Sequence, residues 1–427
     1  MRSRLRVPAI VLALAAAVAG CDSPSSEEPA PERRRITEQG LVEHLRALQR
    51  IADRHGGDRA AGTPGYRASA GYVAGVLRAF GWRVRLEEVP LRLPTETSPP
   101  RLAIGPLGAL EPVREFRAPT YSGSGQGRGA LRPLDGGCSA ADFAALRAGE
   151  VALVPSGGCF NFVKARNAAR AGALALLVGD DTRGRGVPTG TLVFDAPLPV
   201  LIVSRGIARR LSPGMEVSLR VDTAVEPGTT WNVIADAGAA AAGRVSMAGA
   251  HLDSVPAAAG INDNGSGVAT LLEAAQVLGP RPPGRVRLAF WGAEELGLIG
   301  SRRYVGSLSR GDRREIAAYL NLDMVGSPNA VPAVYGDGDA GLTRLLRRVH
   351  PGEEVAVTAA GRSDHAPFDD AGIPVAGLYT GSEERGPGRR PRDPCYHLPC
   401  DTLANVDREV LLRMARATAR ALGELTR

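Results

Sequence analysis

Five short segments concentrate the side chains of this chain that could bind metals and move protons. They contain two histidines and a set of carboxylates, in the order GAHLD (249–253), GINDNGSG (260–267), WGAEELG (291–297), NLDM (321–324) and CYHLPCD (395–401). Imidazole nitrogens and carboxylate oxygens are typical ligands of hydrolytic metal centres, and one carboxylate can bridge two cations. The set therefore predicts a two-metal hydrolytic site whose ligands suit zinc, and also manganese or cobalt.

Spacing within the segments suggests different tasks for neighbouring residues. His251 and Asp253 stand two apart at a strand end, so they share one face, and Asp253 could orient the imidazole. Glu294 and Glu295 are adjacent and point in different directions, so one can ligate a metal while the other faces the substrate water. Each segment alone has a simpler explanation, such as a turn around Asp263 or solvated glutamates at a helix start. Only their combination favours a metal site.

The last two candidate ligands come from different settings. Asp323 ends an apolar strand, whereas His397 lies in a short loop between Cys395 and Cys400. A disulfide across this loop would hold His397 and Tyr396 rigidly, which is the support that a metal ligand needs.

The elements that position these segments alternate between strands and helices. Strands are expected at 244–251, 285–291, 317–323, 331–335 and 373–378, with a helix at 267–278. Such alternation predicts an α/β fold with a largely parallel central sheet between helices. The candidate residues stand at or just past strand ends, where active sites of open α/β sheets form.

The N-terminal half has a different pattern. Apolar residues at helical spacing predict helices at 37–55 and after the turn at 62–65, followed by a strand at 82–89. Residues 120–225 are rich in Gly, Pro and short apolar runs, with strands expected at 151–154, 173–178 and 198–203 and a helix at 162–171. This region therefore reads as a small strand-rich module.

The first residues predict export. Arginines at positions 2, 4 and 6 precede an apolar run that ends VAGC at Cys21, which resembles a bacterial lipobox. Cleavage before Cys21 would leave a lipid-anchored protein on the extracytoplasmic side, with residues 22–35 as a flexible tether and no other membrane contact. An ordinary signal peptide with an incidental cysteine is the alternative.

Cysteine usage agrees with export. Without Cys21 four cysteines remain, an even number that predicts two disulfides in an exported chain. Proximity in sequence favours Cys138 with Cys159 and Cys395 with Cys400. No CxxC pair is present, which argues against a cysteine-based zinc site.

The charge balance does not indicate a nucleic-acid partner. The 427 residues have a formal net charge of +7, but the arginines are scattered and aromatic residues make up only 4%. No nucleic-acid-binding motif accompanies them.

Together the segments AHLDSV, GINDNGSG, WGAEELG, NLDMVG and CYHLPCDT resemble the M28 family of metallopeptidases, especially secreted bacterial aminopeptidases of the Y and S type. The resemblance covers about residues 37 to 427. It implies a zinc exopeptidase fold of the phosphorylase/peptidase-like kind, with the catalytic domain at 37–119 and 226–427. Residues 1–20 would be the signal peptide and 21–36 the lipidated cysteine and linker. Residues 120–225 resemble an inserted protease-associated (PA) domain, clamped by Cys138 and Cys159.

The resemblance also implies a ligand set. One zinc would be held by His251 and Asp323 and the other by Glu295 and His397, with Asp263 bridging them. The peptide bond after Asp263 is expected to be cis in such a site.

Further roles follow from the same resemblance and its mechanism. Glu294 would be the general base, and Asp253 the carboxylate behind the first histidine ligand. Independently of the resemblance, Tyr396, next to the last histidine, could donate to the developing oxyanion, and Arg362, by its position alone, could contact substrate carbonyls. His365 is the rival ligand to the histidine of the last segment, while His44, His55 and His350 are expected at surface or helix positions.

The expected activity is removal of N-terminal residues from peptides with free N-termini, by a monomer. Alternatives on the same scaffold are a carboxypeptidase or dipeptidase and a glutaminyl cyclase-like transferase. A binding protein without catalysis is a further alternative, against which the complete ligand set argues.

Overall fold

A computed structural model describes residues 35–180, 187, 189–239, 243–256, 258–336, 340–349, 363–386, 388 and 390–427. Within these ranges, no helix has the length and apolar composition that crossing a bilayer requires.

The core of the fold is a mixed sheet whose central strands are parallel. Strands run in the order β12, β13, β11, β9, β10 and β8. Parallel pairs join β13 to β11, β11 to β9 and β9 to β10, whereas β12 and β8 pair antiparallel at the two sides. The bounds are β8 Glu216–Ala237, β9 Val245–His251, β10 Arg285–Trp291, β11 Ile316–Leu322, β12 Ala333–Tyr335 and β13 Val375–Tyr379. The expected α/β fold is confirmed.

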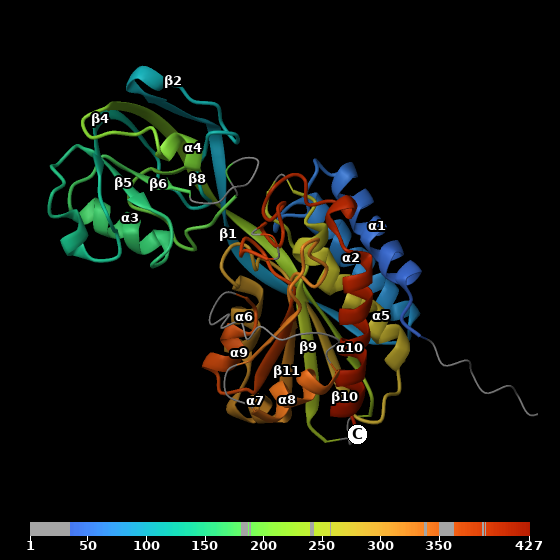
Figure 1. Ribbon diagram of the computed structural model, residues 1–427. Coiled ribbons are helices and arrows are strands. Elements are labelled where there is room, and N and C mark those ends of the chain that lie inside the picture. The colour runs from blue at the N-terminus through green and yellow to red at the C-terminus, as the bar shows by residue number, and fades with distance from the viewer. Residues whose placement is uncertain are drawn as a thin grey trace, which may run out of the picture. The chain divides into compact units, whose positions relative to one another are not determined.

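Helices cover both faces of this sheet (Figure 1). One face packs against α1, α2, α5, α8 and α10 in a large apolar cluster, and the other packs against α6 and α9 around Trp291, Tyr319 and Phe368. Leu41, Leu45 and Leu48 of α1 are fully buried, as their helical spacing predicts. The bounds are α1 Glu38–Arg54, α2 Pro64–Ala79, α5 Ser266–Leu278, α6 Ile299–Ser307, α7 Arg310–Glu315, α8 Ala340–Val349, α9 Ala366–Asp370 and α10 Arg408–Leu425.

Two long antiparallel strands connect the sheet with the inserted module. β1 (Arg83–Ile104) pairs with β8 along almost its whole length. The C-terminal end of β8 pairs with β10, and its N-terminal end pairs with β4 of the module. The strand expected at 82–89 is therefore much longer, because β1 lies at an edge of the sheet, where its prolines need not donate ladder hydrogen bonds.

The module itself is a small sheet with one principal helix. β4, β5, β6 and β7 follow one another as parallel neighbours, and β3 pairs antiparallel with β7. A disulfide joins Cys138 to Cys159, the pairing that sequence proximity favoured. The bounds are β2 Gly108–Ala109, β3 Phe116–Arg117, β4 Gly125–Pro133, β5 Val151–Pro155, α3 Asn161–Arg170, β6 Ala175–Gly179, β7 Val200–Val203 and α4 Arg205–Ala208.

Candidate metal centre

Parallel pairing brings the candidate residues to one edge of the sheet. His251 is the last residue of β9 and lies opposite Trp291, the last residue of β10. Glu294 and Glu295 follow β10 directly, and Asp323 follows β11 on the other side of β9. These residues, far apart in sequence, therefore line one pocket together with Asp263 and His397.

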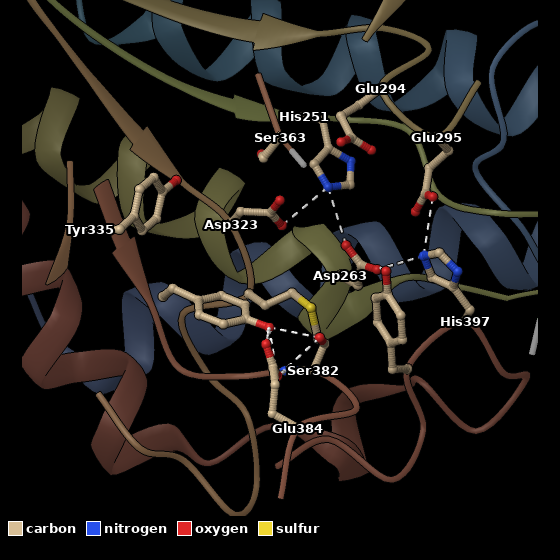
Figure 2. A pocket seen from close by; sticks show the side chains of 13 residues that line it. His251, Asp263, Glu294, Glu295, Asp323, Tyr335, Ser363, Ser382, Glu384 and His397 are labelled. Carbon is tan, nitrogen blue, oxygen red and sulfur yellow. Dashed lines mark hydrogen bonds and ion pairs between the residues drawn. The ribbon is translucent and has the colours of Figure 1, made fainter. Parts of the chain in front are cut away.

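Asp263 lies between the two histidines, as Figure 2 shows. The His251 Nε2 atom is 3.1 Å from Asp263 Oδ1 and 3.3 Å from Asp323 Oδ1. The His397 Nε2 atom is 3.3 Å from Asp263 Oδ2 and 3.2 Å from Glu295 Oε2. The two oxygens of Asp263 thus face two separate groups, each with one histidine and one further carboxylate.

The donor set fits divalent cations. Each imidazole Nε2 atom faces two carboxylate oxygens. A single proton on that nitrogen could form only poor hydrogen bonds to both oxygens at once. In the described part of the chain the buried Glu295 Oε1 atom has no hydrogen-bond partner, a costly arrangement without a cation. Ligand atoms of His251, Asp263 and Glu295 lie within 4.8 Å of one another. Nitrogen and oxygen donors of this mixture suit zinc.

Burial and neighbouring charge shift the protonation of these groups. Burial lowers the pKa of His251, but the carboxylates of Asp323 and Glu294 outweigh it, so the pKa is raised well above 6.5. Burial also lowers the pKa of His397, but the neighbouring carboxylates, Glu295 first among them, outweigh burial and raise the pKa. Burial would raise the pKa of Asp263, but hydrogen bonds from both histidines lower it. The site therefore attracts positive charge strongly.

Asp253 supports the site from behind. Its carboxylate accepts hydrogen bonds from the backbone N–H groups of Glu294 (3.1 Å) and Glu295 (3.2 Å). The His251 Nδ1 atom lies 3.1 Å from the Asp253 carbonyl oxygen and 3.7 Å from its carboxylate. This completely buried aspartate therefore fixes both the imidazole and the turn that presents the glutamates.

The loop that presents Asp263 is held by a residue whose role the sequence did not indicate. The Asp401 carboxylate accepts hydrogen bonds from the backbone N–H groups of Asn262 (2.8 Å) and Asp263 (3.0 Å). The peptide bond between Asp263 and Asn264 is cis, as expected. Asp401 belongs to the CYHLPCDT segment, so its position in that motif was the available signal.

His397 is fixed by a disulfide and by the inserted module. Cys395 and Cys400 are bonded on either side of it. The His397 Nδ1 atom lies 2.6 Å from the Thr189 carbonyl oxygen, and the Thr189 N–H donates to the His397 carbonyl at 3.2 Å. Arg117 in turn donates to the Thr189 hydroxyl. The module thus supports a candidate ligand directly, through a backbone carbonyl that a residue of any type could supply.

The remaining predicted residues fall in several places. Tyr396 lines the pocket and stacks on the His397 ring, with centroids 3.8 Å apart. His365 is buried beside Tyr335 and does not line the pocket. His44 is in helix α1, but it is buried rather than at the surface.

Arg362, Cys21 and His350 lie outside the described residues. His55 caps the C-terminal end of α1.

One wall of the pocket was missed by the sequence analysis. It includes Met324 and Tyr335, and it continues through Tyr379, Ser382 and Glu384, at and just past the end of β13. The signal that could have found the last three was the strand-end rule, because a strand was expected to end at 378 and a polar segment follows it.

Family models and known relatives match most of this chain. A model of peptidase family M28 matches residues 232–422, and a model of the PA domain matches residues 129–211. The probable lipoprotein aminopeptidase LpqL of Mycobacterium tuberculosis is 37% identical, over 92% of this chain and 85% of that protein. An aminopeptidase of Pseudomonas aeruginosa is 34% identical, over 87% of this chain and 77% of its own length. The chain belongs to peptidase family M28.

Solved structures of two aminopeptidases share the fold over more than nine tenths of this M28 chain. BSAP, a zinc aminopeptidase from Bacillus subtilis, superposes with a TM-score of 0.74 at 26% identity, over 92% of this chain and 96% of that one. An aminopeptidase from Aneurinibacillus sp. strain AM-1 gives 0.73 at 27% identity, over 91% and 93%. The five candidate ligands all lie within the residues matched by the family model.

Proposed function

We propose that this M28 peptidase is an exported zinc aminopeptidase that uses two metal ions. The observation that supports it best is the position of Asp263, whose two oxygens face the His251–Asp323 pair and the His397–Glu295 pair. One carboxylate between two such pairs is suited to bridging two cations.

The residues present suit a hydrolytic role for the metals. His251 and Asp323 would hold one zinc, Glu295 and His397 the other, and Asp263 both. When bound, the zinc ions would supply Lewis acidity to the scissile carbonyl and lower the pKa of the attacking water.

Glu294 would act as the general base. It lines the pocket beside the ligands but makes no ion pair with either histidine ligand in the described part of the chain. Burial raises its pKa well above 4.5, and Glu295 adds to that rise. A carboxylate with a raised pKa is a better acceptor of the water proton, which it can then give to the leaving amine.

Other side chains would position the substrate. Tyr396 lies over the second histidine ligand at the pocket wall, so its hydroxyl could donate to the developing oxyanion. Arg362 is proposed to contact substrate carbonyls, and an Arg362→Ala variant with unchanged kcat/KM would refute that role. Asp253 would keep the first imidazole and the base in register.

The setting proposed for this activity is the extracytoplasmic face of the membrane. Lipid attached at Cys21 would anchor the chain, which is proposed to act as a monomer on peptides with free N-termini. The similarity to a probable lipoprotein aminopeptidase supports this location.

Paired substrates test the proposal. Zinc-loaded protein should release chromophore from leucine p-nitroanilide but not from its N-acetylated twin, because an aminopeptidase needs the free amine. Chelation should abolish the activity and added zinc should restore it. Cleavage of the acetylated substrate at an equal rate, or activity that survives complete chelation, would refute the proposal.

A further inference from the structure

The wall of the pocket that faces the metal ligands contains an acidic side chain with no part in the proposed chemistry. Figure 2 shows Glu384, with Ser382, across the pocket from Glu294 and His251. Glu384 comes from the loop after β13, whereas the base and the first ligands follow β9 and β10. It therefore lies on the opposite side of the pocket from the proposed base and the first ligands.

The carboxylate of Glu384 is held in a fixed position. The Tyr379 hydroxyl lies 2.9 Å from each of its oxygens, and the backbone N–H of Ser382 donates to Oε2 at 2.7 Å. The Glu384 backbone is also tied, because its carbonyl accepts from the N–H of Arg392 at 2.8 Å. These contacts orient the group, and among the described residues Oε1 has only the contact with the Tyr379 hydroxyl that it shares with Oε2.

The charge of Glu384 is not neutralised by an ion pair in the described part of the chain. Glu384 is only partly buried and lines the pocket, so a ligand bound in the pocket would lie beside it. Such a group, fixed by neutral donors, attracts a cation that enters the pocket.

The remaining walls suit the stem of a long side chain. Met324, Tyr335 and Tyr396 line the same pocket and present apolar surface or aromatic rings. The methylene stem of a lysine or arginine packs well against such walls, and its cationic head interacts favourably with tyrosine rings. An acidic substrate side chain would be repelled, and a leucine would leave the carboxylate without a new partner.

We propose that Glu384 makes the pocket select peptides whose N-terminal residue is basic, Arg or Lys. This inference rests on the proposed aminopeptidase activity and deepens it. The charged head of the substrate residue would bind the Glu384 carboxylate, and its methylene stem would lie against Met324 and the rings of Tyr335 and Tyr396. Glu384 is thus a specificity-determining residue and takes no part in bond cleavage.

The test compares substrates across two variants of the zinc-loaded full chain. The measured quantity is the ratio of kcat/KM for arginine p-nitroanilide to that for leucine p-nitroanilide. Glu384→Gln keeps the shape and the hydrogen bond from Tyr379 but removes the charge. Glu383→Gln is the matched control, since Glu383 is exposed, does not line the pocket and contacts the same Ser382.

In the wild-type protein and in E383Q the ratio should exceed one. In E384Q it should fall by at least about tenfold, with leucine cleavage changed less than about threefold. An equal loss of kcat/KM for both substrates would overturn the proposal, because it would mean that Glu384 binds the substrate α-amine or is needed for folding. A ratio that E384Q leaves unchanged would overturn it as well.

A binding measurement keeps this test separate from the proposed activity. Calorimetric titration with the free amino acids L-arginine and L-leucine reports on the pocket even if neither substrate is cleaved. Tighter binding of arginine than of leucine, lost in E384Q and kept in E383Q, would support the preference of the pocket for a basic side chain even if no aminopeptidase activity were found. Equal binding of both amino acids would overturn the pocket independently of catalysis.

Discussion

At the scale of single residues, the adjacent pair Glu294 and Glu295 shows how one turn serves two purposes. Glu295 Oε2 faces His397 at 3.2 Å, whereas Glu294 lines the pocket without facing that imidazole. The backbone N–H groups of both glutamates donate hydrogen bonds to the Asp253 carboxylate. The turn therefore cannot rotate to exchange the two side chains. The two glutamates should therefore respond differently to the same substitution.

The first prediction uses this difference. Glu294→Gln should lower kcat by about 10²- to 10⁴-fold, because it removes the group proposed to accept the water proton, and should leave the metal content unchanged. Glu295→Gln should instead weaken the binding of one metal equivalent. Steady-state kinetics with elemental analysis of the same samples measures both. If E294Q kept more than a tenth of the wild-type kcat, the general-base role would be excluded.

The residues that could be predicted at this scale are those of ligand type that stand at strand ends or in the disulfide loop. His251, Asp263, Glu295, Asp323 and His397 were selected from the sequence, and the structure brings them together. Thr189 was not, because it supports His397 through its backbone carbonyl, and any residue type supplies a carbonyl. Glu384 was missed because its neighbours resemble an ordinary polar loop.

At the scale of elements, the loop of His397 depends on two supports of different kinds. One is the disulfide between Cys395 and Cys400, which closes the loop around the candidate ligand. The other is the reciprocal pair of hydrogen bonds with Thr189 of the inserted module. Loss of either should affect the metal centre more than the stability of the sheet, because the loop lies at its edge.

The second prediction concerns the disulfides. Replacing Cys395 and Cys400 by serine should weaken zinc binding by about 10- to 100-fold, because the second histidine ligand would lose its rigid support. Replacing Cys138 and Cys159, whose bond lies in the module, is the matched control and should leave zinc affinity near the wild-type value. Competition with a chromogenic chelator measures both. Equal zinc loss in the two double variants would contradict the prediction.

The third prediction concerns the acid stability of the module. Glu150 pairs with Arg132 through two contacts of 2.7 and 3.1 Å, and these, with a hydrogen bond from the Arg147 backbone, lower its pKa from 4.5 to about 2. A carboxylate whose pKa is lowered in the folded state stabilises that state above pH 4.5. This stabilisation is lost as the pH falls towards 2.

Glu150→Gln should therefore lower the melting temperature at pH 6, and the difference from wild type should shrink between pH 4.5 and 2. The control is Glu216→Gln, which removes an exposed pair that spans 4.0 Å. Thermal unfolding across this pH range is the measurement. A difference that stayed constant with pH would show that the charge of Glu150 is not its source.

Most elements near the metal centre could be predicted from the sequence, but the full length of β1 could not. The strands and helix around the metal centre were expected close to their observed bounds, since apolar runs and alternation are strong there. The strand expected at 82–89 ends at Val89, whereas the observed β1 continues past Pro90 and Pro94. As an edge strand paired on one side by β8, it tolerates those prolines, and edge position depends on tertiary pairing.

At the scale of the whole molecule, the catalytic sheet and the PA domain are joined by more than the β1–β8 pair. Ala293 and Leu296, which flank the two glutamates, belong to the same apolar cluster as Leu192 and Leu198 of the module. The module therefore packs against the turn that presents Glu294, the proposed base, as well as contacting the loop of His397. Insertion of a domain here thus adds support to the metal centre.

The fourth prediction concerns the anchor. Cys21→Ser should move the protein from the membrane fraction to the soluble extracytoplasmic fraction, because it removes the thiol to which lipid would be attached. Fractionation with detection of the activity on leucine p-nitroanilide is the measurement, and the activity itself should not change. Retention of the variant in the membrane fraction would contradict lipid anchoring at this residue.

The most direct test of the account is a crystal structure of the zinc-loaded protein with an anomalous difference map at the zinc absorption edge. Two peaks are predicted, one beside His251 and Asp323 and one beside Glu295 and His397, with Asp263 between them. A single peak, or peaks that do not involve Asp263, would contradict the two-metal centre on which the proposed activity rests.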